Sequence, residues 1–351
     1  MPRDDHAPLR PLSGDPMDLR KIQLTGGSSF TVTLPKEWVS QAELGAGDVV
    51  GFVPQHDGSL AIYPHARLGA TQARYTLEVL TDDPDSVFRG IVAAYLAGFD
   101  VIVVRSKKPL GANARKGVRN AAKRIIGLET VEEDANSVTL QDFLDPKEFH
   151  IDKGLRRMQA LCRAMQEDAL RAFSEELEDV HATFTDRDDE VDRLYWMINK
   201  QYHAILRDPA YAQKMGLNAS QALNYLMCAR LIERTADHAL RIAENVQALR
   251  KDDVAAKLES KIEKQARKAV SLFADSLSTF HKQDAEAANR IIEDAAHFRA
   301  SQDALMRESL GLGGESILHV ALALESIART AAYAADVAET AINHRVAMTA
   351  G

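Results

Sequence analysis

The chain has 351 residues, a length that allows two or three domains. Hydrophobic residues make up 46% and charged residues 27%, a balance typical of a folded globular protein. No run of about 18 apolar residues occurs, so the sequence predicts no membrane span. The two cysteines, Cys162 and Cys228, lie within helical apolar patterns and indicate reduced core thiols in a cytoplasmic protein.

The formal net charge of −8 is unevenly distributed along the chain. Residues 1–66 hold five Lys and Arg against eight Asp and Glu, whereas residues 67–128 hold eleven against five. Residues 129–351 hold 27 against 38, so basic character is confined to the middle of the chain. Residues 1–17 are polar, contain several prolines and have no apolar core, which predicts a disordered leader.

Short strands are predicted across residues 18–66. Alternating apolar residues at 19–25 and 30–34 flank a Gly-Gly-Ser-Ser turn, and residues 49–53 and 59–63 form a second hairpin. Pro35 opens a short helix over 36–41 between the two hairpins. Four strands in about 45 residues bury little surface, so dimerisation is expected.

This order of elements resembles the AbrB/SpoVT/MazE-type swapped-hairpin domain. The family implies two chains that interlace their hairpins, and DNA contacts from basic side chains, which here are Arg20, Lys21 and Lys36. Residues 18–64 nevertheless hold three Lys and Arg against five Asp and Glu, a poor complement to phosphates. DNA binding and dimerisation alone are therefore both open. The resemblance is carried by Arg20-Lys21-Ile22, the run from Ser29 to Trp38, and Leu44-Gly45-Ala46-Gly47-Asp48-Val49-Val50.

Residues 72–145 alternate strand and helix. Gly98 and Gly127 are expected to end the two helices. The pattern predicts a small α/β unit of the βαβαβ kind. Strands are expected over 74–80 and 99–104, helices over 85–97 and 113–126, and one or two further strands over 129–140.

The second helix of this unit is strongly basic. Between Val101 and Leu128 there are eight Lys and Arg and no Asp or Glu. A basic loop ahead of a helix N-terminus can hold an anion such as phosphate, a nucleotide or nucleic acid. A solvated face that pairs with the acidic helical half is the other interpretation. The candidate residues are Lys107, Lys108, Arg115, Lys116, Arg119 and Lys123, with Arg124 beside them.

From residue 150 to the end, the apolar periodicity predicts helices only. Residues 232–244 can be laid on residues 327–339 without a gap, so the third and sixth helices are equivalents. The sequence predicts two three-helix bundles, over 150–250 and 251–347. The predicted fold class is therefore multidomain: a small swapped-hairpin β domain, a small α/β unit and an all-α pair of three-helix bundles. The expected helices span 152–177, 185–207, 218–250, 252–280, 284–309 and 314–345.

Two carboxylate pairs have a spacing of four residues on the second and third helices: Asp188 with Asp192, and Glu233 with Asp237. Residues at this spacing share a helix face, and like charges there repel unless solvent or a cation separates them. Antiparallel neighbouring helices can bring the pairs together, with Asp189 close by. Oxygen ligands suit a hard cation such as Mg, Mn, Ca or Fe. Acids that favour a helix N-terminus would account only for the first pair.

The two acidic segments resemble the motifs of PhoU, the phosphate-uptake regulator family. With its N-terminal module, the chain resembles the archaeal-type PhoU-related proteins that carry an AbrB-like domain. The resemblance implies two three-helix bundles, metal-binding acidic motifs, and regulation of the phosphate ABC transporter and its sensor kinase. Ala328 and Ala332 stand where the first repeat has Glu233 and Asp237, so no comparable metal site is expected in the second bundle. The segments are Glu233-Arg234-Thr235-Ala236-Asp237-His238-Ala239 and Asp188-Asp189-Glu190-Val191-Asp192.

The expected function is a cytoplasmic, non-enzymatic regulator of phosphate uptake. It would act on the ATPase of the phosphate ABC transporter or on its sensor protein, as a homodimer formed by the N-terminal domain and at most peripheral to the membrane. The alternative is a DNA-binding transcription regulator whose helical half senses metal or phosphate. No P-loop, GxGxxG, GxSxG, HExxH or kinase motif occurs. His238 points about 100° away from Asp237 around the helix, so no catalytic residue is assigned.

Overall fold

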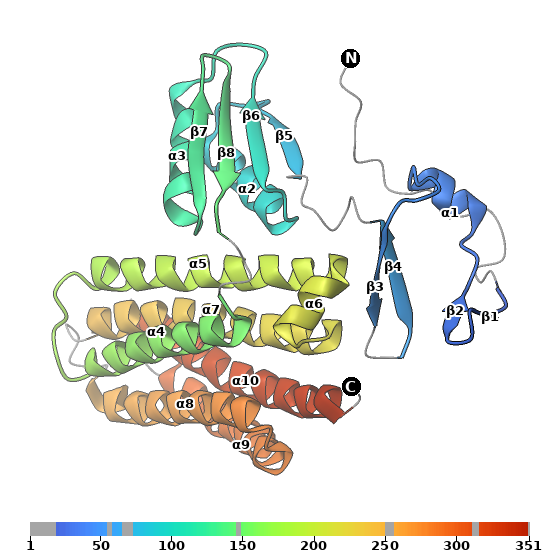
Figure 1. Cartoon of the computed structure of the whole chain (residues 1–351). Helices are drawn as coiled ribbons and strands as arrows, with labels where there is room; N and C mark the ends of the chain where they lie inside the picture. Colours follow the sequence, from blue (N-terminus) through green and yellow to red (C-terminus); the bar gives the residue numbers. More distant parts are fainter. Residues whose placement is uncertain are drawn as a thin grey trace. The chain divides into compact units, whose positions relative to one another are not determined.

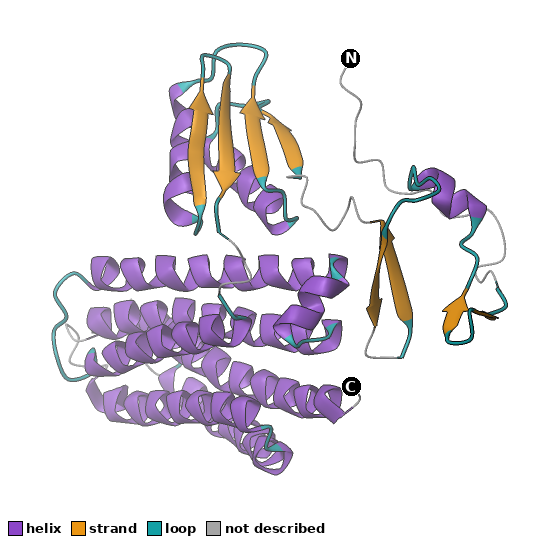
Figure 2. Cartoon of the chain, viewed as in Figure 1, coloured by secondary structure: helices purple, strands orange, loops and turns teal. Residues whose placement is uncertain are grey.

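The computed structural model describes residues 19–54, 58–64, 73–144, 149–249, 256–310 and 316–349. Contacts divide the chain into two compact units, residues 1–71 and residues 72–351. The described strands all precede residue 143 and helices alone follow, which confirms the predicted multidomain order of β first and all-α after (Figure 2). The leader predicted over 1–17 lies outside the described residues.

Two small antiparallel hairpins and one short helix form the first unit (Figure 1). The strands β1 (Gln23–Thr25) and β2 (Ser29–Thr31) pair with each other, as do β3 (Val50–Pro54) and β4 (Leu60–Pro64). The first hairpin turns through Gly26 and Gly27 at φ +65° and +85°, a region that favours glycine. The helix α1 spans Lys36–Gln41, the range that the sequence predicted.

This unit buries little of its own apolar surface. Among its described residues only Val53 and Pro64 are buried. Phe30 is 74% exposed and Ile22 is 70% exposed in the single chain. Because covering apolar surface is favourable, a second copy of the unit remains the expected partner. The large exposed apolar residues are Leu19, Ile22, Leu24, Phe30, Val32, Val49, Phe52 and Leu60.

Residues 73–144 form what we call the α/β module, in which two helices cover a four-stranded sheet. The strand order is β5-β6-β8-β7, and only β5 and β6 are parallel. The sequence predicted a βαβαβ-like unit with one or two strands at its end, and the structure has two, which form an antiparallel hairpin. Ile91, Tyr95, Ile102 and Leu140 are fully buried between helices and sheet. The elements are β5 (Arg74–Glu78), α2 (Pro84–Leu96), β6 (Val101–Arg105), α3 (Ala112–Arg124), β7 (Leu128–Glu133) and β8 (Ser137–Asp142).

The helical half packs its long helices side by side around one hydrophobic core (Figure 1). The two equivalent helices of the repeat, α7 and α10, lie against each other in this core. No described helix is both long enough and apolar enough to cross a membrane. The predicted bundle boundary at 250 and 251 lies outside the described residues. The helices are α4 (Ile151–Arg171), α5 (Val180–Arg207), α6 (Pro209–Met215), α7 (Ala219–Leu249), α8 (Ala256–Lys282), α9 (Ala285–Ser309) and α10 (Ser316–Thr349).

The short helix α6 was not predicted, although its signals are present in the sequence. Asp208 caps it by accepting a hydrogen bond from the backbone of Ala210, and Pro209 occupies its first position. Gly216 ends it at φ +65°. These signals delimit only about two turns of helix, which is too short for apolar periodicity to identify.

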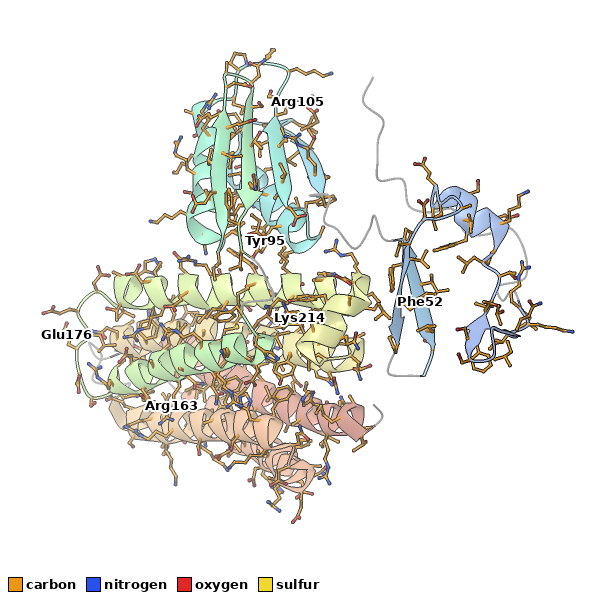
Figure 3. The ribbon with its side chains drawn as sticks, in the orientation of Figure 1. Phe52, Tyr95, Arg105, Arg163, Glu176 and Lys214 are labelled. Carbon is orange, nitrogen blue, oxygen red and sulfur yellow. The ribbon has the colours of Figure 1, made fainter. Side chains whose placement is uncertain are left out.

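A buried ion pair holds the α/β module against α5. Lys200 of α5 pairs with Asp142 at the end of β8, and their side chains are 8% and 2% exposed. The Lys200 ammonium also lies 4.5 Å from the ring centre of Tyr95 on α2, and Figure 3 shows Tyr95 at the end of the module nearest α5. Burial, and secondarily the charge of Asp142, raise the pKa of Tyr95 above its usual range. A charge buried this deeply is tolerated because its partner is buried with it.

Two further contacts extend this interface along α5. The guanidinium of Arg207 donates to the backbone carbonyl of Ala97. Gly98, at φ +79°, lies against that guanidinium, and a Cβ there would clash with it. Trp196 meets the ring of Phe88 on α2 edge to face, with ring centres 5.8 Å apart. The α/β module and the helical half are therefore joined by specific side-chain contacts.

Candidate functional site

The two predicted carboxylate pairs face each other where α5 packs against α7. Asp188 and Asp192 project from α5, and Glu233 and Asp237 project from the middle of α7. We call these four residues, together with Asp189, the acid cluster. The charges of its members act on one another across the two helices, so the structure brings together all five predicted residues.

Burial raises the pKa values of four of these acids, Asp188, Asp192, Glu233 and Asp237. Burial, followed by the charges of Asp237, Asp192 and Asp189, raises the pKa of Asp188 to about 7. Burial also raises the pKa of Glu233 to about 7, although Arg230 opposes the shift. The pKa of Asp192 rises to about 6, again mainly through burial and against the effect of Arg124. The acid cluster therefore lacks enough positive charge to hold all its members ionised at neutral pH.

Asp237 is directly coupled to Asp188. Burial raises its pKa, while the nearby Arg241 and Arg230 guanidinium groups and the Asp188 side chain oppose the rise.

A cation from the α/β module already reaches the acid cluster. Nη2 of Arg124, the last residue of α3, lies 2.6 Å from Asp189 Oδ1 and donates to Asp192 Oδ2 at 3.0 Å. The guanidinium also lies 5.4 Å from the ring centre of Phe88 and 5.5 Å from that of Trp196. Arg124 therefore joins acids on α5 to aromatic residues on both sides of the interface.

A second arginine comes from α7 itself. Arg230 donates to Glu233 Oε1 at 3.1 Å and lies 5.3 Å from the ring centre of Tyr195 on α5. Two carboxylate oxygens remain without a donor among the described residues, Asp188 Oδ1 and Glu233 Oε2, and both are buried. Buried acceptors of this kind are costly unless they are protonated or a cation completes them.

The acid cluster has ligand atoms suited to the predicted metal, but its side chains are not arranged around a common ion position. Its donors are all carboxylate oxygens, which suit a hard cation, and two of them are buried without a donor. Within the described ranges, however, no three His, Cys, Asp or Glu side chains are arranged so that they could hold one ion. Arg124 and Arg230 engage oxygens that a metal would need. Metal binding by Asp188, Asp189, Asp192, Glu233 and Asp237 stays a prediction.

His238, the neighbour of Asp237, faces away from the cluster. Its side chain is buried, and its ring lies 5.8 Å from that of Tyr333 on α10. Burial lowers its pKa, which favours the neutral ring. His238 is therefore a core residue between the two repeats.

The predicted anion patch on α3 is only partly free. Arg115 pairs with Glu133 and donates to the backbone carbonyls of Asp134 and Ala135, so it holds the module together. The N-terminus of α3 is already satisfied, because the Asp82 carboxylate accepts from the backbone of Ala114 at 2.8 Å. An anion at that helix end would have to displace Asp82. The remaining predicted residues, Lys107, Lys108, Lys116, Arg119 and Lys123, lie at least partly exposed on the module surface.

The predicted DNA contacts Arg20, Lys21 and Lys36 are exposed in the first unit. Arg20 and Lys21 precede β1, and Lys36 opens α1. Their exposure is compatible with phosphate contacts, and DNA binding stays a prediction.

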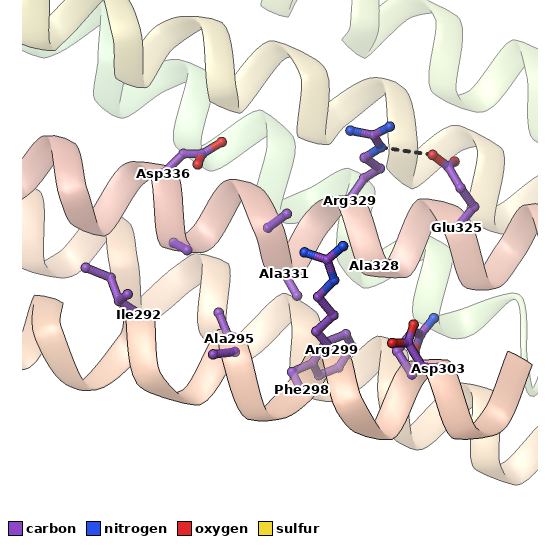
Figure 4. Close-up of a pocket in the computed structure, with 14 residues that line it drawn as sticks. Ile292, Ala295, Phe298, Arg299, Asp303, Glu325, Ala328, Arg329, Ala331 and Asp336 are labelled. Atoms are coloured by element: carbon purple, nitrogen blue, oxygen red, sulfur yellow. Dashed lines mark hydrogen bonds and ion pairs between the residues drawn. The ribbon is translucent and has the colours of Figure 1, made fainter.

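The second repeat has an open groove at the position that corresponds to the acid cluster. A groove of about 610 Å³ lies between α9 and α10, and its lining includes Ala328 and Ala332, the counterparts of Glu233 and Asp237. Figure 4 shows Arg299 on α9 and the ion pair of Arg329 with Glu325 at its edges. The two alanines line this groove, and the absence of a metal site from this half stays a prediction.

Two features of the interface were missed by reasoning from the sequence. Arg124 was grouped with the basic residues of its helix, and nothing in the local pattern distinguishes it from Lys123. Lys200 and Asp142, which form the buried pair, are 58 positions apart in the chain and belong to different modules. Only the packing of α3 and β8 onto α5 identifies their roles.

The fold and the site together define a class of protein: a helical bundle with facing acidic pairs on two neighbouring helices, preceded by a small hairpin unit. Residues 155–246 match the PhoU domain family, and residues 23–69 match the family described as antidote-toxin recognition MazE, bacterial antitoxin. The chain therefore combines a PhoU domain with a MazE-type domain. This is the combination that the sequence predicted.

The PhoU match includes the whole acid cluster, while the groove between α9 and α10 lies outside the matched residues. No curated protein and no solved structure matches the chain significantly.

Proposed function

We propose that the protein regulates phosphate uptake through protein–protein contacts with the ATPase of the phosphate ABC transporter or with its sensor protein. The observation that carries the proposal is the PhoU-domain match over residues 155–246, which contains all five acids of the cluster. The proposal includes no catalytic step, and it assigns the acid cluster to sensing.

We further assign a hard divalent or trivalent cation to the acid cluster. The support is chemical: five carboxylates converge, burial and mutual repulsion raise the pKa values of most of them, and two buried oxygens lack donors. A cation would supply the missing positive charge and complete both oxygens. Asp188, Asp192, Glu233 and Asp237 would hold it, with Asp189 at the edge.

The first unit is assigned the role of dimerisation. Its exposed apolar strands and the MazE-type match support a homodimer in which two copies cover each other. Light scattering on the full chain would be expected to give a dimer. A monomer at micromolar concentration would contradict this part of the proposal.

The functional test is phosphate uptake in a cell that lacks the gene. We expect uptake of radiolabelled phosphate to lose its response to external phosphate, and the wild-type chain to restore it. The D188N/D237N double variant should fail to restore it, whereas Asp303→Asn, the same change in the α9/α10 groove, should succeed. Unaltered uptake in the deletion strain would contradict the proposal. Capture of the transporter ATPase by the full-length protein would identify the partner.

The second candidate function is DNA-binding transcription regulation, which the MazE-type match and the exposed Arg20, Lys21 and Lys36 favour. In a gel-shift assay, binding that falls steeply with salt and disappears in an R20A/K21A variant would support it. Loss of the phosphate-uptake phenotype through the same two changes would indicate that both functions use the first unit.

A further inference from the structure

We propose that α10 carries a self-complementary surface on which a second copy of this chain docks, with the two α10 helices antiparallel and centred at the level of Ile327. This contact is separate from the first unit, to which dimerisation is already assigned. It goes beyond the proposed function and depends neither on phosphate nor on any bound ligand. The surface consists of the residues that α10 leaves exposed.

The exposed residues of α10 form a single narrow stripe. Between positions 318 and 339 every other residue of the helix is buried or half-buried, because α7, α8 and α9 pack against it. The exposed positions follow alternating steps of four and three, a period of about 3.5 that is typical of the seam between two packed helices. We call these residues the α10 stripe: Leu318, Leu322, Glu325, Arg329, Ala332, Asp336 and Glu339.

One end of the α10 stripe is apolar. Leu318 is 57% exposed and Leu322 is 44% exposed in the single chain. The two leucines are four residues apart and therefore lie on one face of the helix. Covering large apolar side chains is favourable, so this end of α10 is suited to contact with another protein surface.

The centre of the α10 stripe is complementary to itself in charge. In an antiparallel pair centred at Ile327, Glu325 of each copy lies opposite Arg329 of the other copy. Within one chain these two side chains pair at 2.9 Å (Figure 4), and both stay about half exposed, at 47% and 58%. Two copies would place two acids and two bases in alternation, so each charge would have an opposite charge across the contact.

The same register sets a large residue against a small one. Leu322 of one copy lies opposite Ala332 of the other. Ala332 also lines the groove of about 610 Å³ between α9 and α10, together with further alanines of both helices. A leucine side chain therefore has room there, and small residues let two helices approach closely. Leu318 and Asp336 face each other at the two ends of the contact, which stay open to solvent.

The corresponding positions of α7 cannot pair in this way. The alignment of the two repeats places Arg230 at the position of Glu325. Arg234 corresponds to Arg329. An antiparallel pair of α7 helices would set arginines against each other, and like charges repel. Arg230 is also engaged by Glu233 of its own chain. The self-complementary surface is therefore specific to the second repeat.

Disulfide cross-linking of the full chain tests the register. In L322C/A332C the two new thiols are ten residues apart on one helix, about 15 Å, which is too far for a bond within one chain. A bond between two copies is expected, and a non-reducing gel should show a covalent dimer. The natural cysteines, Cys162 and Cys228, are buried and should not react. One helix pair is smaller than a standard interface, so the contact should be weak and the oxidation is done at about 100 µM.

The matched control is K264C/A274C, which places two exposed thiols ten residues apart on α8. It should give no covalent dimer. L322C alone and A332C alone should give none either, since neither position faces itself across the contact, whereas an equal mixture of these two variants should cross-link. Absence of the covalent dimer in L322C/A332C would overturn the inference. Equal cross-linking in the control or in either single variant would do the same.

Charge reversal tests the centre of the contact in the mixture of L322C and A332C chains. Adding Glu325→Arg to both chains sets arginine against arginine and should lower the cross-linked fraction about tenfold. Adding Glu325→Arg to one chain and Arg329→Glu to the other sets opposite charges across the contact, and cross-linking should return. Each chain then still lacks its own ion pair, so the recovery can come only from contact between copies.

A cross-linked fraction that does not respond to these charge changes would overturn the proposed register. The thermal midpoint of each charge variant should match that of wild type, because exposed pairs contribute little to folding. Light scattering at micromolar concentration reports the dimer assigned to the first unit, so failure of the α10 contact is distinguished from failure of that dimer.

Discussion

The acid cluster beside α7 and the groove beside α10 occupy equivalent positions in the two repeats. Ile232 and Ala236 of α7 are buried, and so are their counterparts Ile327 and Ala331 of α10. The difference lies on the outward face, where Glu233 and Asp237 of α7 correspond to alanines. The helical core is thus common to both repeats, while the chemistry of the groove is not.

What covers each groove differs as well. At the acid cluster, Arg124 of the α/β module pairs with Asp189 and Asp192 of α5. The second repeat has an open groove of about 610 Å³. Burying the ionised acids costs free energy of desolvation, which burying the alanines does not. A nearby positive charge offsets this cost.

The largest expected effect comes from the buried pair that anchors the α/β module beside the first groove. Lys200→Met leaves the Asp142 charge buried without this partner, which should destabilise the second unit by about 3 kcal/mol or more. Urea unfolding followed by circular dichroism measures the loss. Lys214→Met, at an exposed position near the end of α6, is the control and should have little effect. An unchanged midpoint in Lys200→Met would mean that the interface does not depend on the pair.

Copying the second repeat into the first separates the fold from the site. The E233A/D237A variant should fold and lose Mn²⁺ binding. In the presence of chelator it should be at least as stable as wild type, with a gain on the order of 1 kcal/mol after allowance for partial solvation. Calorimetry and thermal melts measure the two effects. Unchanged metal content together with unchanged thermal stability would remove the argument for a functional acid pair.

The acid cluster and the α9/α10 groove should also contribute differently to the pH dependence of the stability of the folded chain. The pKa of Asp188 is about 7 in the folded chain against an ordinary value of 3.8, and that of Glu233 is about 7 against 4.5. Between these values the folded state holds protons that the unfolded state has lost, so stability falls as pH rises through this window. In the absence of metal, these two acids therefore stabilise the folded chain most at the low-pH end of this window.

Denaturation midpoints at about pH 5 and about pH 8, in chelator, measure this slope. Asp188→Asn should flatten it, and Asp303→Asn in the second groove should not. Buried His238 and His344 have lowered pKa values and act in the opposite direction. Their share cancels when each variant is compared with wild type. An identical slope in wild type and Asp188→Asn would contradict the raised pKa.

The smallest effect is expected at the edge of the second groove. Arg329→Ala breaks an exposed pair with Glu325, at 2.9 Å and four residues apart on α10. Exposed pairs of this kind contribute little, so the thermal midpoint and the Mn²⁺ affinity should both stay unchanged. A clear loss of either would show that the second groove is not the inert counterpart of the first.

Most of the local structure could be predicted from the sequence. Apolar periods of 3.6 and 2 located the long helices and the strands that the structure describes, and the gap-free match of residues 232–244 to 327–339 revealed the repeat. The five acids were also accessible, because a spacing of four places each pair on one helix face. The short helix α6 was not, since few residues carry its signal, and the sequence left open whether the α/β module ends in one strand or two.

How the parts act on one another depends on tertiary packing. The role of Arg124 requires α3 to end beside α5, and the Lys200–Asp142 pair joins residues from two modules. No local pattern encodes such contacts, because a charge on a helix surface looks the same whether it meets solvent or a buried acid. The five acids can be identified from the sequence, whereas the raised pKa values of four of them arise from burial, and their pairing with Arg124 arises from the approach of a second module.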